Sequence, residues 1–163
     1  MATVEVGDLV TAEMLGLALD PPRGRISASG TQALADATQV AIAFTVEDID
    51  SDGQHDTVTN NSRVTPNVAG TYRFFGTGFM DGLATGVSFD CNLRKNGSTN
   101  LAPGARTVGS AQVTGINCTV LVDMNGTTDY IELMLRQDSA GADVTTQSAQ
   151  FTCVLEWQLV SGA

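Results

Sequence analysis

Apolar and polar residues alternate along most of this chain with the period of two that is typical of β-strands. The clearest case is the segment 87–94, which is predicted to be a half-buried strand. Its apolar positions are Val87, Phe89, Cys91 and Leu93. The segment 150–160 shows the same alternation with larger apolar residues, and we expect it to lie in the middle of a sheet. Its inward positions are predicted to be Phe151, Cys153, Leu155, Trp157 and Leu159.

The segment 71–80 differs because both of its faces carry aromatic residues. Tyr72 and Phe74 share one face, and Arg73 and Phe75 share the other, since side chains alternate across a strand. A strand that is apolar on both faces is typical of the centre of a sheet rather than its edge. We therefore expect the fold to be built around this strand.

Gly76 and Gly78 continue the face of Tyr72 without a side chain. Glycine within a strand often marks a bend or the close approach of another part of the chain. A short strand at 62–65 and a turn at 66–70 are predicted to lead into this segment.

Further strands and turns follow from the same alternation and from the turn residues. Strands are expected at 25–28, 39–46, 113–123 and 129–136. Asn96-Gly97 and Asn125-Gly126 each predict a type I′ hairpin turn, because these residue types tolerate positive φ angles. Loops are expected at 47–56, which is acidic, and at 139–147, which is polar. About eight strands with irregular connections favour an all-β jelly-roll sandwich.

Residues 1–24 form a separate N-terminal arm in this interpretation, and residues 25–163 form the jelly-roll domain. Thr11 is a candidate N-cap for a helix of about two turns that the prolines at 21–22 end. So short a helix is not stable alone and needs a surface to pack on. The apolar residues predicted to dock on a partner are Val10, Met14, Leu15 and Leu19.

Composition and charge narrow the function further. The chain has 163 residues, of which only 16% are charged, and a formal net charge of −10. This charge argues against binding to nucleic acid, whose phosphates need cationic partners. No apolar run reaches the roughly 20 residues of a membrane helix, and the first ten residues lack the pattern of a signal peptide. Three cysteines without metal-ligand spacing are expected to be buried free thiols in a protein folded in a reducing cytoplasm, and one disulfide with a spare thiol is the less favoured alternative.

Candidate chemistry is sparse. Asp48, Asp50 and Asp52, followed by Gly53, match the start of a calcium loop, but Thr59 stands where a bidentate acid is needed. An ordinary solvated loop is the favoured alternative, with these three aspartates as a weak calcium site at most. His55 is the only histidine, and no Gly-x-Ser-x-Gly nucleophile motif accompanies it. We expect no enzymatic activity, no cofactor and no catalytic metal.

Aromatic residues on strands are more often core or subunit interface than a platform for stacking sugars. Tyr72, Phe74, Phe75 and Phe79 are open to both interpretations. We take Tyr72, Phe74 and Tyr130 as the candidate residues of a trimer interface.

Several phrases of this sequence resemble the jelly roll shared by complement globular heads and tumour-necrosis-factor-like trimers, and above all its bacteriophage and bacterial members. The phrases are NSRVT at 61–65, AGTYRF at 69–74, LRKNG at 93–97, DYIEL at 129–133, QDS at 137–139 and TVEDIDSDG at 45–53. Their order and spacing span residues 25–160. The resemblance implies a compact homotrimer whose members bind proteins or glycans rather than catalyse reactions.

The segment VGDLVTAEML at 6–15 is similar to the openings of phage tail and head structural proteins. No collagen-like stalk or signal peptide is seen, which favours a virion component assembled in bacterial cytoplasm. We expect a trimeric decoration protein that binds the major capsid protein of a phage head. The alternatives are a tail-fibre or tail-tip head that binds a host-surface glycan or protein, and a non-viral adhesive or carbohydrate-binding module.

Overall fold

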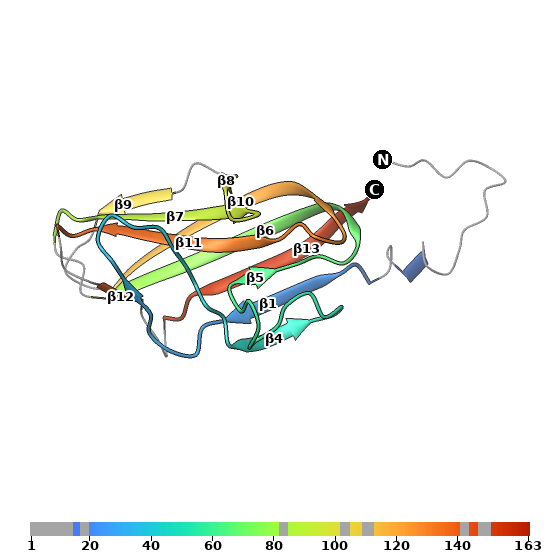
Figure 1. Cartoon of the computed structure of the whole chain (residues 1–163), viewed down its shortest axis with the longest axis horizontal. Coiled ribbons are helices and arrows are strands. Elements are labelled where there is room, and N and C mark those ends of the chain that lie inside the picture. The colour runs from blue at the N-terminus through green and yellow to red at the C-terminus, as the bar shows by residue number, and fades with distance from the viewer. Residues whose placement is uncertain are drawn as a thin grey trace.

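The computed structural model describes residues 15–16, 20–81, 85–101, 105–108, 113–140, 144–146 and 151–163. These residues form two antiparallel β-sheets packed face to face (Figure 1). In that view β7 and β11 of one sheet lie in front of β6 and β10 of the other. The all-β sandwich predicted from the alternation of apolar residues is confirmed.

The first sheet, called sheet A, is organised around its longest strand, β6. Its strands are β1 (Arg23–Ser27), β2 (Ala33–Leu34), β4 (Val46–Asp50), β6 (Ala69–Asp81), β10 (Thr114–Asn125), β12 (Val144–Thr146) and β13 (Val154–Gly162). Across the main part of the sheet the order is β4, β1, β13, β6 and β10. The strand β12 pairs with the end of β6 and with β2. Both β6 and β13 therefore lie mid-sheet, as predicted.

The second sheet, called sheet B, is centred on the pair β7–β11. Its strands are β3 (Val40–Ala41), β5 (Arg63–Val64), β7 (Ser88–Lys95), β8 (Thr99–Asn100), β9 (Ala105–Val108) and β11 (Ile131–Asp138). Two short strands, β3 and β5, pair with β11, while β8 and β9 pair with β7. Sheet B is thus a two-stranded centre extended by short strands on both sides.

The core lies between the two sheets and is continuous. Both Tyr72 and Phe74 of β6 are completely buried in it, and the Tyr72 hydroxyl donates a hydrogen bond to the Val68 carbonyl (3.1 Å). The two glycines of β6 leave gaps that leucines of sheet B fill. A Cβ at Gly76 would lie 2.5 Å from Leu133, and one at Gly78 would lie 2.4 Å from Leu135. The close approach predicted at these glycines is therefore made by side chains of β11.

The prediction of one continuous strand at 39–46 is wrong. Val40–Ala41 pairs with β11 of sheet B, to which the Ile42 N–H also donates a hydrogen bond, and the chain then crosses to sheet A, where β4 pairs with β1. Ile42 and Phe44 are buried in the core during the crossing. Alternation alone shows that these side chains point inward, but the pairing partner changes midway, and that change comes from the tertiary fold.

The predicted loops are wrong in part for the same reason. The acidic segment 47–56 begins as strand β4, and the polar segment 139–147 contains β12. The short strands β2, β8 and β9 were not predicted. Two to four residues are too few to show a period, so such strands are defined by the neighbours with which they pair.

The two predicted hairpin turns have different outcomes. Asn96 and Gly97 both have positive φ angles, 52° and 70°, as a type I′ turn requires. At the second site only Gly126 has a positive φ angle (72°), and β11 begins five residues later at Ile131. The prediction of a two-residue turn at Asn125-Gly126 is therefore wrong, and a longer loop joins β10 to β11.

Candidate interaction surfaces

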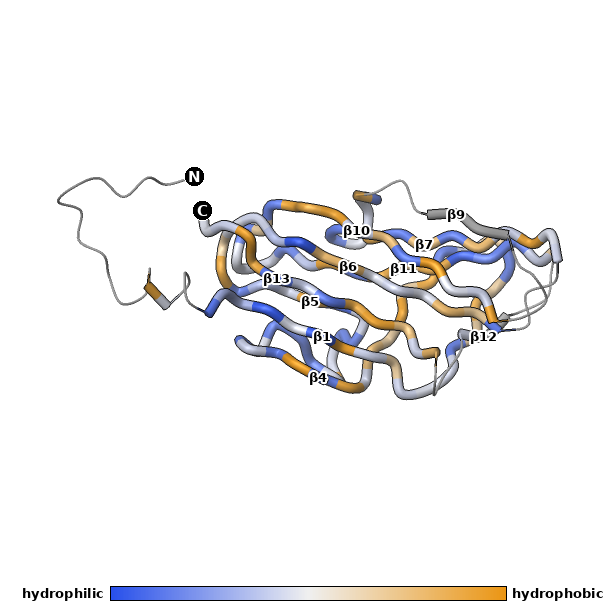
Figure 2. The backbone as a smooth tube through the Cα atoms, turned by 180° about the vertical axis from the view of Figure 1, so that it is seen from behind, coloured by the Kyte–Doolittle hydropathy of each residue, from blue (hydrophilic) through white to orange (hydrophobic). Residues whose placement is uncertain are grey.

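The outward face of sheet A carries apolar and cationic side chains on neighbouring strands. In register across β4, β1, β13, β6 and β10, one row of outward residues is Ile49, Arg25, Glu156, Phe75 and Thr119. The next row, across β1, β13, β6 and β10, is Arg23, Gln158, Arg73 and Leu121. We call these nine residues the sheet A face. Figure 2 shows the side of the molecule on which β1, β4, β6, β10 and β13 lie.

Two large apolar side chains on this face are unusually exposed. Ile49 is 50% exposed and Leu121 is 57% exposed. Leu121 of β10 lies diagonally across from the half-buried Phe75 of β6, whereas Ile49 lies on β4, three strands away from Phe75. Leu121 and Phe75 therefore form one exposed apolar group, and such groups are typical of protein–protein contact surfaces.

A hollow of about 280 Å³ lies in the middle of the sheet A face, and three arginines line it. Arg25 is paired with Asp48 (3.0 Å) and Glu156 (3.1 Å). For Arg73, no ion pair with another described residue is seen. Three of the eight basic residues of a chain with net charge −10 therefore border one hollow. Arg23 is also paired, with Asp20, so of these three arginines only Arg73 lacks an ion pair among the described residues and can meet a carboxylate of a partner.

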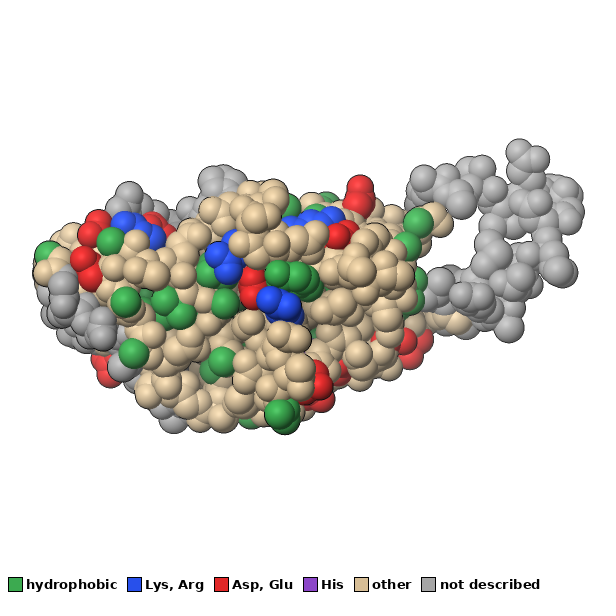
Figure 3. Space-filling model, viewed as in Figure 1, with side chains coloured by type: hydrophobic (Ala, Val, Ile, Leu, Met, Phe, Trp, Pro, Cys, Tyr) green, Lys and Arg blue, Asp and Glu red, His purple; other side chains and the backbone are tan. Residues whose placement is uncertain are grey.

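The outward face of sheet B is different, because its charges neutralise one another. Glu132 is buried and lies between Arg94 (3.2 Å) and Arg63 (3.6 Å), and Arg136 pairs with Asp90 (3.1 Å). Figure 3 shows basic and acidic side chains next to one another on the face turned to the viewer. On the sheet A face Arg23 and Arg25 are paired too, so the two faces differ in Arg73 and in the exposed side chains of Ile49 and Leu121.

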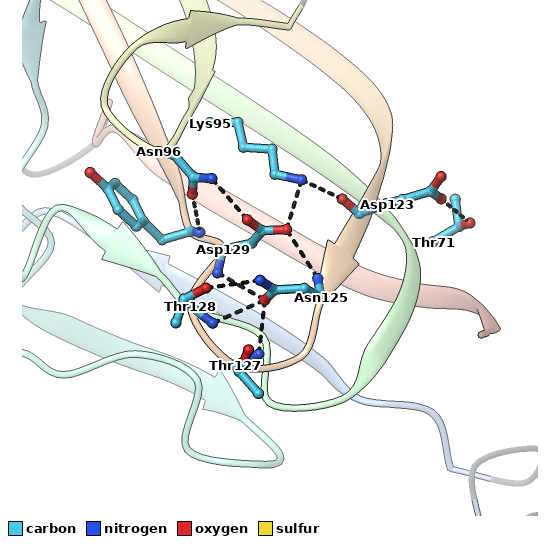
Figure 4. A network of polar contacts seen from close by, with 9 residues as sticks. Thr71, Lys95, Asn96, Asp123, Asn125, Thr127, Thr128 and Asp129 are labelled. Atoms are coloured by element: carbon cyan, nitrogen blue, oxygen red, sulfur yellow. Dashed lines mark hydrogen bonds and ion pairs between the residues drawn. The ribbon is translucent and has the colours of Figure 1, made fainter.

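At one end of the sandwich, polar contacts join the β7–β8 hairpin to the β10–β11 loop (Figure 4). The Asn125 side-chain oxygen accepts hydrogen bonds from the backbone N–H groups of residues 127, 128 and 129. Asp129 in turn accepts from the Asn96 side chain (2.8 Å) and from the Asn125 backbone (3.0 Å), and pairs with Lys95 (2.8 Å). This arrangement lowers the pKa of Asp129, with the Asn96 hydrogen bond as the main cause and Lys95 next.

A second, larger hollow of about 550 Å³ lies beside this network. Residues of the β4–β5 connection and of the β10–β11 loop line it, including Asp56, Thr59, Asn60, Arg63, Thr128 and Tyr130. The Arg63 guanidinium lies 4.1 Å from the centre of the Tyr130 ring. Hydroxyls, an amide, a carboxylate and one aromatic ring are the groups with which proteins orient small polar ligands.

The structure corrects two of the three residues predicted for a trimer interface. Tyr72 and Phe74 have no exposed surface, because their face of β6 points into the sandwich. Their neighbours Arg73 and Phe75 point outward instead. The sequence indicates which residues share a face, but not which face is covered by the second sheet. Tyr130 is half buried beside the second hollow, and its role in a trimer stays a prediction.

The three aspartates of the candidate calcium site have other partners. Asp50 accepts hydrogen bonds from the backbone N–H groups of Gln54 and His55 (both 3.0 Å) and, more weakly, of Asp52. Asp48 pairs with Arg25, and the carboxylate of Asp52 accepts from the Ser51 hydroxyl. Within the described parts of the chain, no group of three or more acidic, histidine or cysteine side chains is arranged to hold a metal ion.

His55 links two segments of the chain. Its Nδ1 lies 2.9 Å from the Arg63 carbonyl oxygen and its Nε2 lies 3.2 Å from the Phe44 carbonyl oxygen. Both ring nitrogens thus contact backbone, which ties the β4–β5 connection to the segment that crosses between the sheets.

Of the residues predicted to dock on a partner, Leu15 is described, and Val10, Met14 and Leu19 lie outside the described residues. Leu15 has helical backbone conformation and is 51% exposed. The chain enters the sandwich at Pro22, whose carbonyl accepts a hydrogen bond from the Leu159 N–H (2.8 Å). No helix among the described segments has the length and apolar character needed to cross a membrane.

No family model and no curated protein matches this chain. Solved structures do match. Murine APRIL at pH 5.0 aligns with a TM-score of 0.62 and 8% identity, over 86% of this chain and 100% of that chain. A structure of murine APRIL at pH 8.0 gives a TM-score of 0.60 and 8% identity, over 85% and 98%. These are jelly rolls of the tumour necrosis factor family, so the chain has a tumour-necrosis-factor-like jelly-roll fold.

Proposed function

We propose that this protein is a trimeric structural component of a phage virion, which decorates the head shell by binding the major capsid protein. The phrases at 61–65, 69–74 and 129–133 support the trimer, and the segment 6–15 supports the virion role, through the resemblances described above. The proposal assigns the sheet A face to contacts between subunits and the part of the N-terminal arm before β1, residues 1–22, to the capsid.

The sheet A face is the observation that carries this proposal. It combines exposed apolar side chains at Ile49 and Leu121 with Arg73, which lines the hollow and has no ion pair among the described residues. The chain has a net charge of −10, so a second copy can supply a carboxylate for Arg73. In a ring with three-fold symmetry, each copy packs its sheet A face against an edge of the next copy. All three sheet A faces are then covered.

Sedimentation of the purified full chain tests the trimer. We expect Leu121→Glu to dissociate it, because a leucine gains about 1.5–3 kcal/mol from burial and a buried unpaired glutamate costs several more. Val58→Glu is the matched control, since Val58 is 84% exposed in a loop away from the sheet A face. A wild-type chain that is monomeric at micromolar concentration contradicts the proposal, as does a Leu121→Glu variant that remains trimeric.

Electron microscopy of virions labelled against this protein tests the location. We expect label over the head surface. Label confined to the tail tip contradicts the decoration role and favours the second candidate, a tail-fibre or tail-tip head that binds a glycan.

The second hollow is the observation that favours this second candidate. Its hydroxyls and amide, with the Tyr130 ring, match the hydrogen-bonding and stacking groups of a sugar site. Titration of the full chain with neutral oligosaccharides from the host surface is the test, with Tyr130→Ala as the variant that should weaken binding. Saturable binding that Tyr130→Ala does not change would place the glycan elsewhere on the protein.

A further inference from the structure

Two buried cysteines from opposite sheets meet in the core. Cys91 lies on β7 of sheet B and Cys118 lies on β10 of sheet A, and their Sγ atoms are 2.9 Å apart. A disulfide bond is about 2.05 Å long, so the two atoms would need to approach by less than about 1 Å. The backbones of β7 and β10 also come within 8 Å of each other.

The sequence provides the space for this pair. Cys118 is opposite Gly76 in the β10–β6 ladder, and its Sγ is 3.4 Å from where a Cβ of Gly76 would lie. A larger residue at position 76 would fill the gap in which the two sulfurs meet. Cys153, the third cysteine, is engaged elsewhere, because its Sγ accepts a hydrogen bond from the Phe79 N–H (3.4 Å).

We propose that Cys91 and Cys118 are a redox pair, which forms a disulfide between the two sheets when the protein meets a disulfide oxidant. The pair is reduced in the cytoplasm, where thiols are maintained, and becomes oxidised outside it. The bond joins strands whose cysteines are 27 positions apart and locks sheet A onto sheet B. This inference does not depend on the proposed virion role or on the trimer.

The chemistry is thiol–disulfide exchange in two steps. Cys118 reacts first, since it is 7% exposed and Cys91 is fully buried. Cys118 loses its proton to water, and its thiolate attacks one sulfur of a small disulfide, whose other sulfur leaves as a thiolate. The Cys91 thiolate then attacks the Cys118 sulfur and releases the second thiolate. The two protein thiols lose two protons and two electrons, and the oxidant is reduced to two thiols.

The fraction of the cysteine thiols that is deprotonated controls the rate of this exchange. The hydrogen bond with Cys118, followed by removal from water, raises the pKa of the Cys91 thiol above its ordinary value. Because the thiolate is the attacking species, oxidation of the folded protein is slow at neutral pH and faster in alkaline buffer. Refolding in the presence of oxidant removes this barrier.

The test is to refold the full chain in a buffer of reduced and oxidised glutathione and then to count free thiols in denaturant. We expect one free thiol of the three, and a cross-linked peptide pair that contains Cys91 and Cys118. The melting temperature should rise on oxidation and return when dithiothreitol is added.

Two variants distinguish this pair from any other. Cys153→Ser should leave no free thiol after oxidation and keep the rise in melting temperature. Cys118→Ser should keep two free thiols and lose the rise. Three free thiols in the refolded wild-type chain, or a cross-link that contains Cys153, overturns the proposal, and neither measurement requires the variants to fold.

Discussion

At the scale of single residues, carboxylates organise the loops of this protein. Asp50 accepts backbone hydrogen bonds in the connection that follows β4, and Asp129 accepts hydrogen bonds and a lysine pair in the loop between β10 and β11. Hydrogen bonds to charged groups are stronger than those between neutral groups. These two residues are therefore expected to contribute to stability, although both lie outside the apolar core.

The first prediction concerns pH and Asp129. Its pKa in the folded protein lies below the ordinary value of 3.8, so its stabilising contribution is fully present above pH 3.8. The contribution is lost as the pH falls through the lower, folded-state pKa. Asp129→Asn should therefore reduce the free energy of unfolding at pH 7, with a difference from wild type that narrows below pH 3.8.

Urea denaturation at a series of pH values measures this difference. Asp81→Asn is the control for loss of a carboxylate, because Asp81 is exposed at the end of β6. An Asp129→Asn difference that is equally large at pH 7 and at pH 2 would contradict the electrostatic explanation.

The second prediction compares Asp50 with Asp52. Asp50→Ala leaves three backbone N–H groups without their acceptor and should lower the free energy of unfolding by about 1–3 kcal/mol. Asp52→Ala should change it by less than about 0.5 kcal/mol, as surface substitutions usually do, because the carboxylate of Asp52 accepts from the adjacent Ser51 side chain, whereas the Asn67 side chain bonds to the Asp52 backbone carbonyl, which the substitution keeps. Equal losses for the two variants, measured in the same urea titration, would show that Asp50 has no special role in the loop.

At the scale of elements, the strands differ in how readily the sequence shows them. The long strands β6, β7, β10, β11 and β13 have enough alternating positions to be predicted, and all five are found. The crossing between β3 and β4, and the two-residue strands, depend on partners that are far away in the sequence. The alternation of apolar residues can be seen within a single segment, whereas strand pairing depends on two segments together.

The third prediction concerns the loop between β10 and β11. Gly126 has a φ angle of 72°, and a Cβ there would lie 2.4 Å from the Ala69 backbone nitrogen. Gly53 has a similar φ angle of 64°, with nothing within 4 Å of the same position. Gly53→Ala should thus cost about 1–2 kcal/mol for the backbone conformation alone, and Gly126→Ala should cost clearly more because the backbone must also move.

Thermal unfolding of the two variants in parallel separates the two effects. A Gly126→Ala variant that is no less stable than Gly53→Ala would mean that the loop moves away from β6 at little cost.

At the scale of the whole molecule, the two sheets have different outward faces, and the N-terminal arm joins the sandwich where β13 ends. The sheet A face carries exposed apolar residues and three arginines, and the sheet B face is closed by ion pairs. In Figure 1 the start of β1 and the C-terminal end of the chain lie at the same end of the sandwich. The chain therefore enters the sandwich through sheet A, next to the end of β13.

The fourth prediction is that removal of residues 1–19 separates attachment from folding. The truncated chain should retain the melting temperature and the oligomeric state of the full chain, but should no longer bind isolated capsids. Leu15→Ser should weaken binding in the same direction, because Leu15 is exposed in the free protein and gains about 1.5–3 kcal/mol if it is buried on the partner. Each of the arms in an oligomer multiplies this loss through avidity.

Co-sedimentation with capsids and differential scanning calorimetry are the two measurements. A truncated chain of unchanged stability that still binds capsids would contradict the docking role. A large fall in melting temperature would show instead that the arm packs on its own sandwich.

The sequence by itself determined the fold class, the long strands, the turn at Asn96-Gly97 and the burial of the three cysteines, because each of these follows from local alternation or from the conformational range of a few adjacent residues. Only the tertiary structure decided that Tyr72 and Phe74 point into the core while Phe75 and Arg73 point out. Alternation divides a strand into two faces, but the second sheet covers only one of them. The contact between Cys91 and Cys118 also comes from the tertiary structure. The distance between their two strands is set by packing across the core, and neither strand's sequence indicates it.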